Sequence, residues 1–375
     1  MARRRMSHWL PIVFACVAVA SGASAVQAQA QNADGVTFKV GVTTRHVLPS
    51  GPYDWRGAGS HALLEVVWYP AESGAQPKPQ RIPPVGEAIF EAAPAAPEAR
   101  IALSPQKFPL ILLSHGTGGT AQSIAWFATA LASRGYIVAA VNHPGNNAME
   151  PYTVQGFVLW WLRAKDISTV LDDILADPDF APRIDQQQIN AAGFSLGGYT
   201  MIELAGGITS RRHFDAVCAA APDQVSCHAP PEFADLLAKA RALEASDPGF
   251  AQALRGDEQP YRDPRIRAFF AMAPALGPAF TPDSLKTIDR PVMIVAGAAD
   301  HVVPVDANAK YLAATIPHAA LTIFSGGVDH YTFLDQCTPV GRDTRPMLCV
   351  DKPGVDREAV HDATVALAAK FFGGR

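Results

Sequence analysis

Residues 189–198 read INAAGFSLGG. A short apolar run leads into the pattern Gly193-Phe194-Ser195-Leu196-Gly197, and a helix-like segment follows, which is the strand, sharp turn and helix context that G-x-S-x-G requires. A side chain at Gly193 or Gly197 would collide with the neighbouring strand or helix, so the glycines let the hydroxyl of Ser195 stand free at the edge of a sheet. The stretch therefore predicts a nucleophilic serine at the end of a strand.

A serine hydroxyl is a weak nucleophile, so it needs a base that takes its proton and an acid that orients the base. Downstream, the apolar run 291–299 ends at Asp300, and the strand candidate 320–324 leads into a glycine-bearing loop that presents His330. Because both residues follow strand candidates, we expect them at the same sheet edge as Ser195. The chain order predicts Ser195 as nucleophile, Asp300 as acid and His330 as base.

Two neighbouring residues are alternatives for these roles. Asp329 adjoins the predicted base and His301 adjoins the predicted acid. Adjacent side chains in an extended loop point apart, which disfavours both alternatives. A purely structural role, as a turn or cap residue, is the other interpretation of Asp300 and His330.

Acyl transfer passes through an oxyanion that backbone N–H groups stabilise. Leu196, the residue after the nucleophile, is the candidate for one donor, and the loop after the third strand candidate, residues 114–119 (SHGTGG), provides the other. Within that loop we predict Thr117 as the donor and expect His115 to hold the loop in shape by hydrogen bonding. No Lys followed by Ser or Thr comes after these glycines, which disfavours a phosphate-binding loop.

Short β-branched runs alternate with longer amphipathic stretches from about residue 36 to the end. This alternation predicts an α/β fold with a mostly parallel sheet and helices on both faces. We expect eight strands, at residues 38–44, 63–69, 110–114, 136–142, 189–194, 268–272, 292–296 and 320–324. We expect helices at residues 121–134, 162–176, 198–205, 307–316 and 357–372.

Two stretches interrupt the alternation. Residues 71–99 are rich in proline and alanine, which predicts a surface loop. Residues 222–263, called the insertion below, contain the helical segment 231–246 and should lie above the carboxyl ends of the strands, where ligands bind. We expect a lid or cap there, the alternative being a surface excursion held by a disulfide. The apolar run 157–162 fits an acyl pocket and a buried core equally well.

The N-terminus has the pattern of an export signal. Three arginines at positions 3–5 precede an apolar run, residues 9–20, and a small-residue stretch, residues 21–30. This pattern predicts a signal peptide, residues 1–30, cleaved after Ala28 or Ala30, and an α/β domain over residues 31–375. The apolar run is shorter than the roughly 20 residues that span a bilayer, so we expect a periplasmic or secreted protein without a stable membrane anchor; a lipoprotein through Cys16 is the alternative.

Cleavage removes three arginines and no acids, so the formal charge changes from -4 to -7. An acidic surface disfavours nucleic acid and anionic membranes as main partners. Four cysteines remain, and an even number in an exported chain indicates two disulfides. They are Cys218, Cys227, Cys337 and Cys349. Three pairings are possible, and the two sequence-local pairs are favoured because each closes a short stretch. Neither pair has the spacing of a zinc site, so no metal is expected.

On these residues the chain resembles the α/β-hydrolase branch that includes the platelet-activating-factor acetylhydrolases and bacterial proteins labelled predicted dienelactone hydrolases. The resemblance covers about residues 36–372, and its most specific segments are residues 108–116 (FPLILLSHG), 131–145 (LASRGYIVAAVNHPG) and 163–166 (RAKD). It implies the α/β-hydrolase fold, hydrolysis of small-molecule or lipid-derived carboxylic esters, and no cofactor. It also implies Ser195, Asp300 and His330 as triad and Thr117 and Leu196 as oxyanion donors.

Two other functions stay open from the sequence. A secreted lipase or cutinase-type polyester hydrolase uses the same chemistry but needs a more open cleft than the insertion is expected to leave. A non-catalytic binding protein on the same fold would have lost members of the triad. All three residue types are present here, which favours the enzyme.

Overall fold

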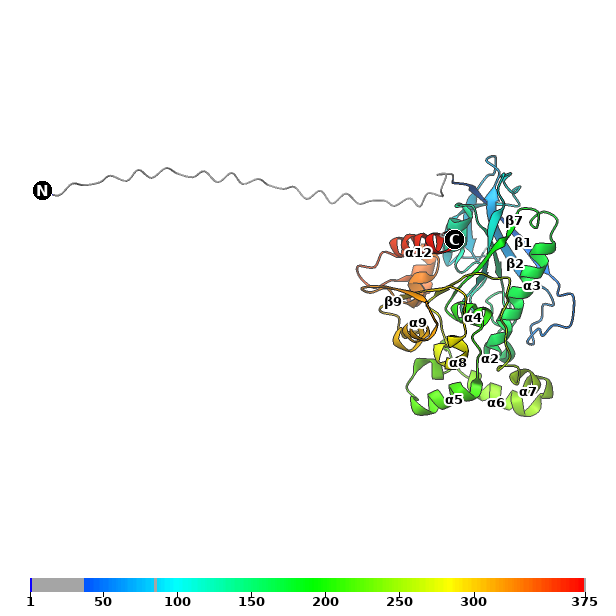
Figure 1. Ribbon diagram of the computed structural model, residues 1–375, viewed down its shortest axis with the longest axis vertical. Coiled ribbons are helices and arrows are strands. Elements are labelled where there is room, and N and C mark those ends of the chain that lie inside the picture. The colour runs from blue at the N-terminus through cyan, green and yellow to red at the C-terminus, as the bar shows by residue number, and fades with distance from the viewer. Residues whose placement is uncertain (2–36, 84–85, 374–375) are drawn as a thin grey trace. The chain divides into compact units, whose positions relative to one another are not determined.

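The computed structural model describes Met1, residues 37–83 and residues 86–373. Apart from Met1, the expected signal peptide and Cys16 lie outside these described residues. In the described part a twisted sheet carries helices on both sides, with α3 and α12 on opposite faces (Figure 1).

Eleven strands of the described residues form one sheet, in the order β10-β9-β8-β7-β5-β6-β2-β1-β4-β11, with β3 paired to β4. The strands are β1 (Lys39–Val47), β2 (Leu63–Ala71), β3 (Lys78–Ile82), β4 (Phe90–Pro97), β5 (Phe108–Ser114), β6 (Ile137–Val141), β7 (Ile184–Phe194), β8 (Phe269–Met272), β9 (Val292–Gly297), β10 (Ala320–Phe324) and β11 (Gln336–Cys337). The six neighbours from β10 to β6 are all parallel, whereas β2 pairs antiparallel with β6. The predicted mostly parallel sheet is therefore confirmed, and each of the eight expected strands is present.

The prediction of a surface loop over residues 71–99 is wrong, because β3 and β4 form there. β4 pairs parallel with β1 and antiparallel with β3 and β11. Its alanines Ala92, Ala95 and Ala96 are buried, and the first two belong to the apolar core on the α1 side of the sheet. Alanine and proline have low strand propensity, so the segment has no strand pattern of its own and is held by its packing.

The helices that follow the strands cover both faces. They are α1 (Ala125–Ala132), α2 (Val154–Val158), α3 (Arg163–Ala176), α4 (Leu196–Ala205), α5 (Arg211–Ala220), α6 (Leu236–Ser246), α7 (Pro248–Leu254), α8 (Pro282–Lys286), α9 (Tyr311–Thr315), α10 (Pro339–Thr344), α11 (Pro346–Cys349) and α12 (Arg357–Gly373). Ile167, Val170, Leu171 and Ile174 form a helical i, i+3, i+4, i+7 stripe that buries α3 against one face together with α4. α1 and α12 pack on the other face. None of the helices in the described residues is long and apolar enough to span a membrane.

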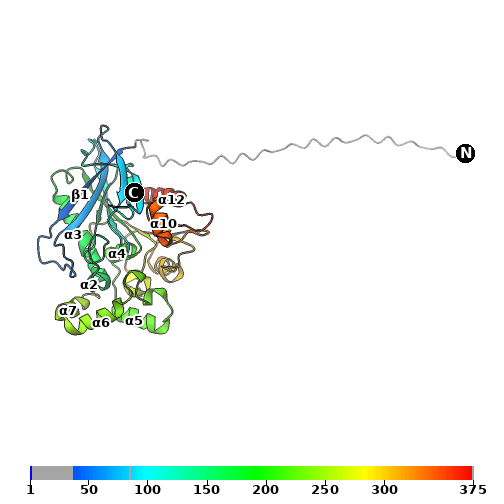
Figure 2. The same cartoon turned by 180° about the vertical axis from the view of Figure 1, so that it is seen from behind.

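Between α4 and β8 the chain leaves the sheet and forms a row of helices. α5, α6 and α7 lie side by side at one end of the domain in both views (Figures 1 and 2). α5 begins at Arg211, before the insertion, and a short helix, η3 (Pro231–Phe233), precedes α6. Phe250 and Leu254 of α7 form a small core with Leu159, Trp161 and Leu162. The apolar run 157–162 is thus mostly buried beneath this helical row.

The structure contains both sequence-local cysteine pairs. A disulfide joins Cys218 of α5 to Cys227 of the insertion, with a Cα–Cα distance of 5.6 Å. The second joins Cys337 to Cys349, with a Cα–Cα distance of 5.5 Å, and closes the segment after β11. Each bond therefore restrains a segment that the sheet does not hold directly.

Candidate active site

The turn after β7 holds Ser195 in a strained conformation. Its φ of 57° and ψ of -117° are unusual for a residue with a side chain, and such backbone strain clusters at functional sites. A Cβ on Gly193 would lie 2.3 Å from the carbonyl oxygen of Gly197, and a Cβ on Gly197 would lie 2.0 Å from that of Ser114. The predicted steric need for glycine at both positions is therefore confirmed.

Ser195, His330 and Asp300 come together at the carboxyl edge of the sheet in one hydrogen-bonded chain. Nε2 of His330 lies 2.9 Å from Oγ of Ser195, and Nδ1 lies 2.8 Å from Oδ2 of Asp300. A carboxylate only accepts hydrogen bonds, so Nδ1 carries the proton and Nε2 accepts from the serine hydroxyl. All three side chains are buried. This arrangement lets the imidazole remove the serine proton while the carboxylate stabilises the resulting cation.

Local hydrogen bonds orient the acid and the histidine loop. Oδ1 of Asp300 accepts from the backbone N–H groups of Val302 and Val303, at 3.0 and 2.7 Å, which leaves Oδ2 for the imidazole. The loops after β9 and β10 are tied together, since the N–H of Ala299 donates to the carbonyl of Val328 at 2.9 Å. This bond holds the loop of the acid beside the loop of the base.

The two alternative residues lie beside the triad but outside it. Asp329 accepts from the backbone N–H of His330 at 2.7 Å and faces the ring of His301 at 2.9 Å. The His301 side chain is 64% exposed. Neither residue contacts the ring of His330 or Ser195 through its side chain, so the geometry favours the predicted pairing.

The loop that carries Thr117 lies against the nucleophile. A Cβ on Gly116 would lie 3.1 Å from Cβ of Ser195. The N–H of Gly118 is already engaged, because it donates to Oδ1 of Asn146 at 2.7 Å. Within the described residues, the N–H groups of Thr117 and Leu196 donate to no protein acceptor. Both stay available for an oxyanion.

His115 holds this loop rather than serving as a base. Its Nδ1 lies 2.6 Å from the carbonyl of Gly116, and its Nε2 accepts from the N–H of His143 at 3.2 Å. Burial and the nearby charge of Arg163 hold the pKa of His115 well below its usual range. The ring is therefore neutral, with its proton on Nδ1, as a loop-shaping role requires.

The insertion reaches the loop that carries Thr117. Glu232 of η3 comes within 3.8 Å of the position a Cβ would take on Gly118, and the ring of Phe233 packs edge-on to Phe157 at 5.3 Å. The Tyr152 hydroxyl donates to the carbonyl of Gly118 at 3.1 Å. Glu232 and Phe233 lie in the insertion expected as a lid, and Phe157 begins the apolar run singled out in the sequence, whereas Tyr152 carries no motif and was missed.

A buried polar cluster below the loop was also missed. It includes His143 and Asp166, which are fully buried and 2.7 Å apart. Both lie in segments with a family resemblance, but their contact joins the loop after β6 to α3 and is visible only in the folded chain. In the described residues no group of three or more His, Cys, Asp or Glu side chains is arranged to hold a metal ion.

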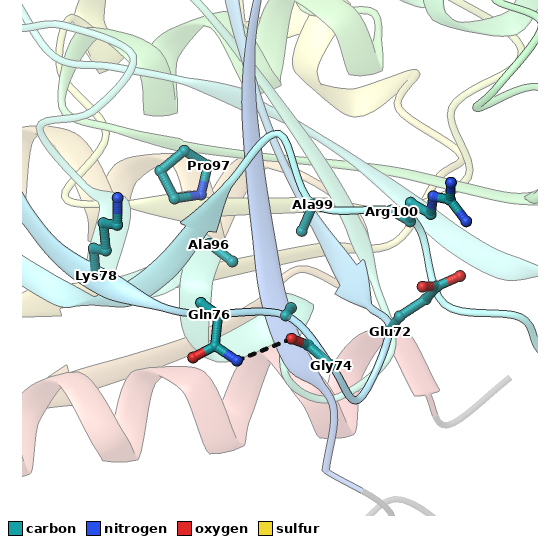
Figure 3. Close-up of a pocket in the computed structure, with 9 residues that line it drawn as sticks. Glu72, Gly74, Gln76, Lys78, Ala96, Pro97, Ala99 and Arg100 are labelled. Carbon is teal, nitrogen blue, oxygen red and sulfur yellow. Dashed lines mark hydrogen bonds between the residues drawn. The ribbon is translucent and has the colours of Figure 1, made fainter.

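A separate surface pocket of about 330 Å³ is lined by residues after β2 and β4, among them Glu72, Lys78 and Arg100 (Figure 3). β2 runs antiparallel to β6 and ends beyond the start of that strand, so this pocket lies at the sheet edge opposite the triad. Lys78 and Arg100 are exposed, and the lining residues include no Ser, Cys or His.

Two comparisons relate the chain to known proteins. The model of the alpha/beta hydrolase family matches residues 110–340, which include all three members of the hydrogen-bonded chain. The solved structure of a ferulic acid esterase from Streptomyces cinnamoneus is 20% identical, covers 90% of this chain and 91% of its own, and superposes with a TM-score of 0.57. At that identity the likeness demonstrates a shared fold.

Proposed function

This chain belongs to the alpha/beta hydrolase family, and from that premise we propose that it is a serine esterase that hydrolyses carboxylic esters by acyl transfer. The observation that carries the proposal is the hydrogen-bonded chain from Ser195 through His330 to Asp300, with Oγ 2.9 Å from the imidazole. The strained turn at Ser195 and two free N–H groups beside it support the same chemistry.

In the proposed mechanism His330, oriented by Asp300, takes the proton of Ser195 as its Oγ attacks the ester carbonyl. The N–H groups of Thr117 and Leu196 stabilise the oxyanion. His330 then protonates the leaving alcohol, and the acyl-enzyme forms. Water, deprotonated by the same imidazole, attacks the acyl-enzyme, and His330 then protonates Oγ of Ser195 as the acid leaves.

The proposed substrates are short-chain or lipid-derived esters, as in the acetylhydrolase and dienelactone-hydrolase-like branch that the sequence resembles. The insertion supports this choice, because Glu232 approaches Gly118 in the loop that carries Thr117, and the adjacent Phe233 packs on Phe157. We propose that residues 222–263 act as the lid. The rings of Tyr152, Phe157 and Phe233 pack on one another, and Tyr152 also donates to the carbonyl of Gly118. Aromatic acyl groups are therefore included in the test, and the solved neighbour is called a ferulic acid esterase.

We further propose that residues 1–30 direct export of the chain. The enzyme then hydrolyses small-molecule esters in the periplasm or outside the cell. The two disulfides support an oxidising compartment.

The deciding experiment is hydrolysis of p-nitrophenyl esters from acetate to palmitate, with methyl ferulate beside them, by wild type and Ser195→Ala. We expect a maximum at acetate or butyrate and a loss of about 10⁴-fold or more in kcat for the variant. A fluorophosphonate probe should label the wild type once per chain and leave the variant unlabelled. A maximum at long chains would indicate a lipase, activity retained by the variant would place the nucleophile elsewhere, and a folded wild type that neither labels nor turns over would indicate a binding protein.

A further inference from the structure

A second Ser–His–Asp chain lies buried beside the first. Oγ of Ser114 is 2.8 Å from Nε2 of His143, and Nδ1 of His143 is 2.7 Å from Oδ2 of Asp166. The carboxylate fixes the tautomer, so Nδ1 of the ring donates to Asp166 and Nε2 accepts from the Ser114 hydroxyl. Ser114, His143 and Asp166 are thus hydrogen-bonded to one another in the same way as Ser195, His330 and Asp300.

This second chain does not form a second catalytic centre. Ser114, His143 and Asp166 have no exposed surface. Ser114 ends β5, and its carbonyl lies against Gly197, where even one added carbon atom would not fit. Because no substrate can reach the Ser114 hydroxyl, the three residues can act only through what they hold in place.

Asp166 connects these three residues to a segment that is distant in the sequence. Its Oδ1 accepts from Nη2 of Arg56 at 2.6 Å and from the hydroxyl of Tyr53. Burial raises the pKa of the Asp166 carboxyl, and the adjacent guanidinium opposes that shift. With both oxygens bound, Asp166 fixes the position of the His143 ring.

The cluster is joined to the oxyanion loop at His115. The N–H of His143 donates to Nε2 of His115 at 3.2 Å, and Nη2 of Arg163 donates to the His115 carbonyl. Arg163 is 1% exposed, and its Nε and Nη1 have no hydrogen-bond partner among the described residues. Burying a guanidinium with so few partners costs stability. The hydrogen bond from Arg163 to the His115 carbonyl therefore indicates that this guanidinium holds the loop that carries Thr117.

We propose that Ser114, His143, Asp166 and Arg163 form a positioning cluster that fixes the N–H of Thr117 where the oxyanion develops. The inference rests on the proposed esterase function. Oxyanion donors lower the barrier only when they are held in place before the reaction, and a misplacement of about 1 Å costs up to about 10²-fold in rate. The cluster touches no substrate, so its members are positioning residues.

The test uses Arg163→Met, the conservative Arg163→Lys, His143→Gln and the minimal Ser114→Ala. Active sites are titrated with a fluorophosphonate, and kcat and KM are measured with p-nitrophenyl butyrate. The inhibition constant of an alkyl trifluoromethyl ketone is measured as well, because its tetrahedral adduct fills the oxyanion hole. We expect kcat per titrated site to fall about 10- to 100-fold in Arg163→Met and His143→Gln while KM changes less than about threefold. The inhibition constant should rise by the same factor by which kcat falls. Arg163→Lys should recover part of the lost kcat.

Ser168→Ala is the matched control. Ser168 lies on α3 like Asp166 and donates to Asp263 at 2.8 Å, away from the loop, so its removal should affect stability alone. The proposal is overturned if kcat and the inhibition constant per titrated site stay at wild-type values while only the thermal midpoint falls. Where the larger changes unfold the chain, Ser114→Ala decides, with an expected loss of about three- to tenfold. A wild type that neither labels nor hydrolyses esters overturns the proposed function and this inference with it, whereas an active wild type with unchanged variants overturns this inference alone.

Discussion

Position 197 shows how little room the turn around Ser195 leaves. A Cβ there would lie 2.0 Å from the carbonyl oxygen of Ser114, which is backbone and cannot rotate away. We predict that Gly197→Ala lowers the free energy of unfolding by about 3 kcal/mol and abolishes ester hydrolysis. Gly59→Ala is the control, since Gly59 is exposed and has open space around it. Denaturant unfolding of both variants checks this, and a Gly197→Ala protein with wild-type stability and activity would contradict it.

The stability of the folded protein should depend on pH through His361, which packs beside the loop of His330. It stacks on Trp126 at 3.8 Å and its Nε2 donates to the carbonyl of Thr332, next to the catalytic loop. Burial, assisted by the charge of Arg357, lowers the pKa of His361 to about 4. His361 is therefore protonated at a lower pH in the folded state than in the unfolded state, where its pKa is about 6.5. The contribution to stability is complete above about pH 6.5 and is lost as the pH falls toward 4.

The loss should be on the order of 3 kcal/mol between pH 6.5 and 4. His361→Phe keeps an aromatic ring for stacking and removes the titration, so its unfolding free energy should be lower at pH 7 but fall less steeply on acidification. Subtracting the two unfolding curves cancels the groups that both proteins share. Parallel curves would show that His361 does not control acid stability.

At the scale of elements, we propose that the insertion decides which esters reach the triad. The ring of Phe233 packs on Phe157, and its neighbour Glu232 lies near Gly118 of the oxyanion loop. We predict that Phe233→Ala widens the mouth and raises kcat/KM for p-nitrophenyl octanoate relative to acetate by about tenfold, because a hydrophobic wall discriminates chain lengths by about 1–3 kcal/mol.

The control for that experiment is Leu237→Ala in the same insertion, where the side chain is 46% exposed. It should leave the ratio of the two rates unchanged. An unchanged ratio in Phe233→Ala as well would mean that the insertion does not border the acyl site.

At the scale of the whole molecule, export and cysteine pairing are tested together. Protein recovered from the periplasm or medium should begin at residue 29 or 31 and carry two disulfides, since loss of Cys16 leaves four cysteines, all paired in the structure. Intact mass after alkylation without reductant should show no added group, and four groups after reduction. An uncleaved N-terminus or a free thiol would contradict the proposed compartment.

From the sequence alone we predicted the residue ranges of eight core strands and proposed Ser195, Asp300 and His330 at the ends of three of them. The strand predictions are confirmed because strand patterns are local. The three residues come within hydrogen-bond distance because parallel strands bring their carboxyl ends to one edge. β4 escaped prediction for the converse reason: its alanines and prolines favour no local structure, and it forms a strand only where β1, β3 and α1 pack against it.

Only the tertiary structure decided what surrounds the triad. Arg163 meets the His115 carbonyl across 48 positions, Arg56 meets Asp166 across 110, and Phe233 meets a ring on α2. Sequence spacing does not encode such contacts, because they arise when helices and loops from separate strands pack on one sheet edge. The physical reason is burial: a guanidinium or carboxylate inside the protein must be held by polar groups, and those partners are chosen by the fold as a whole.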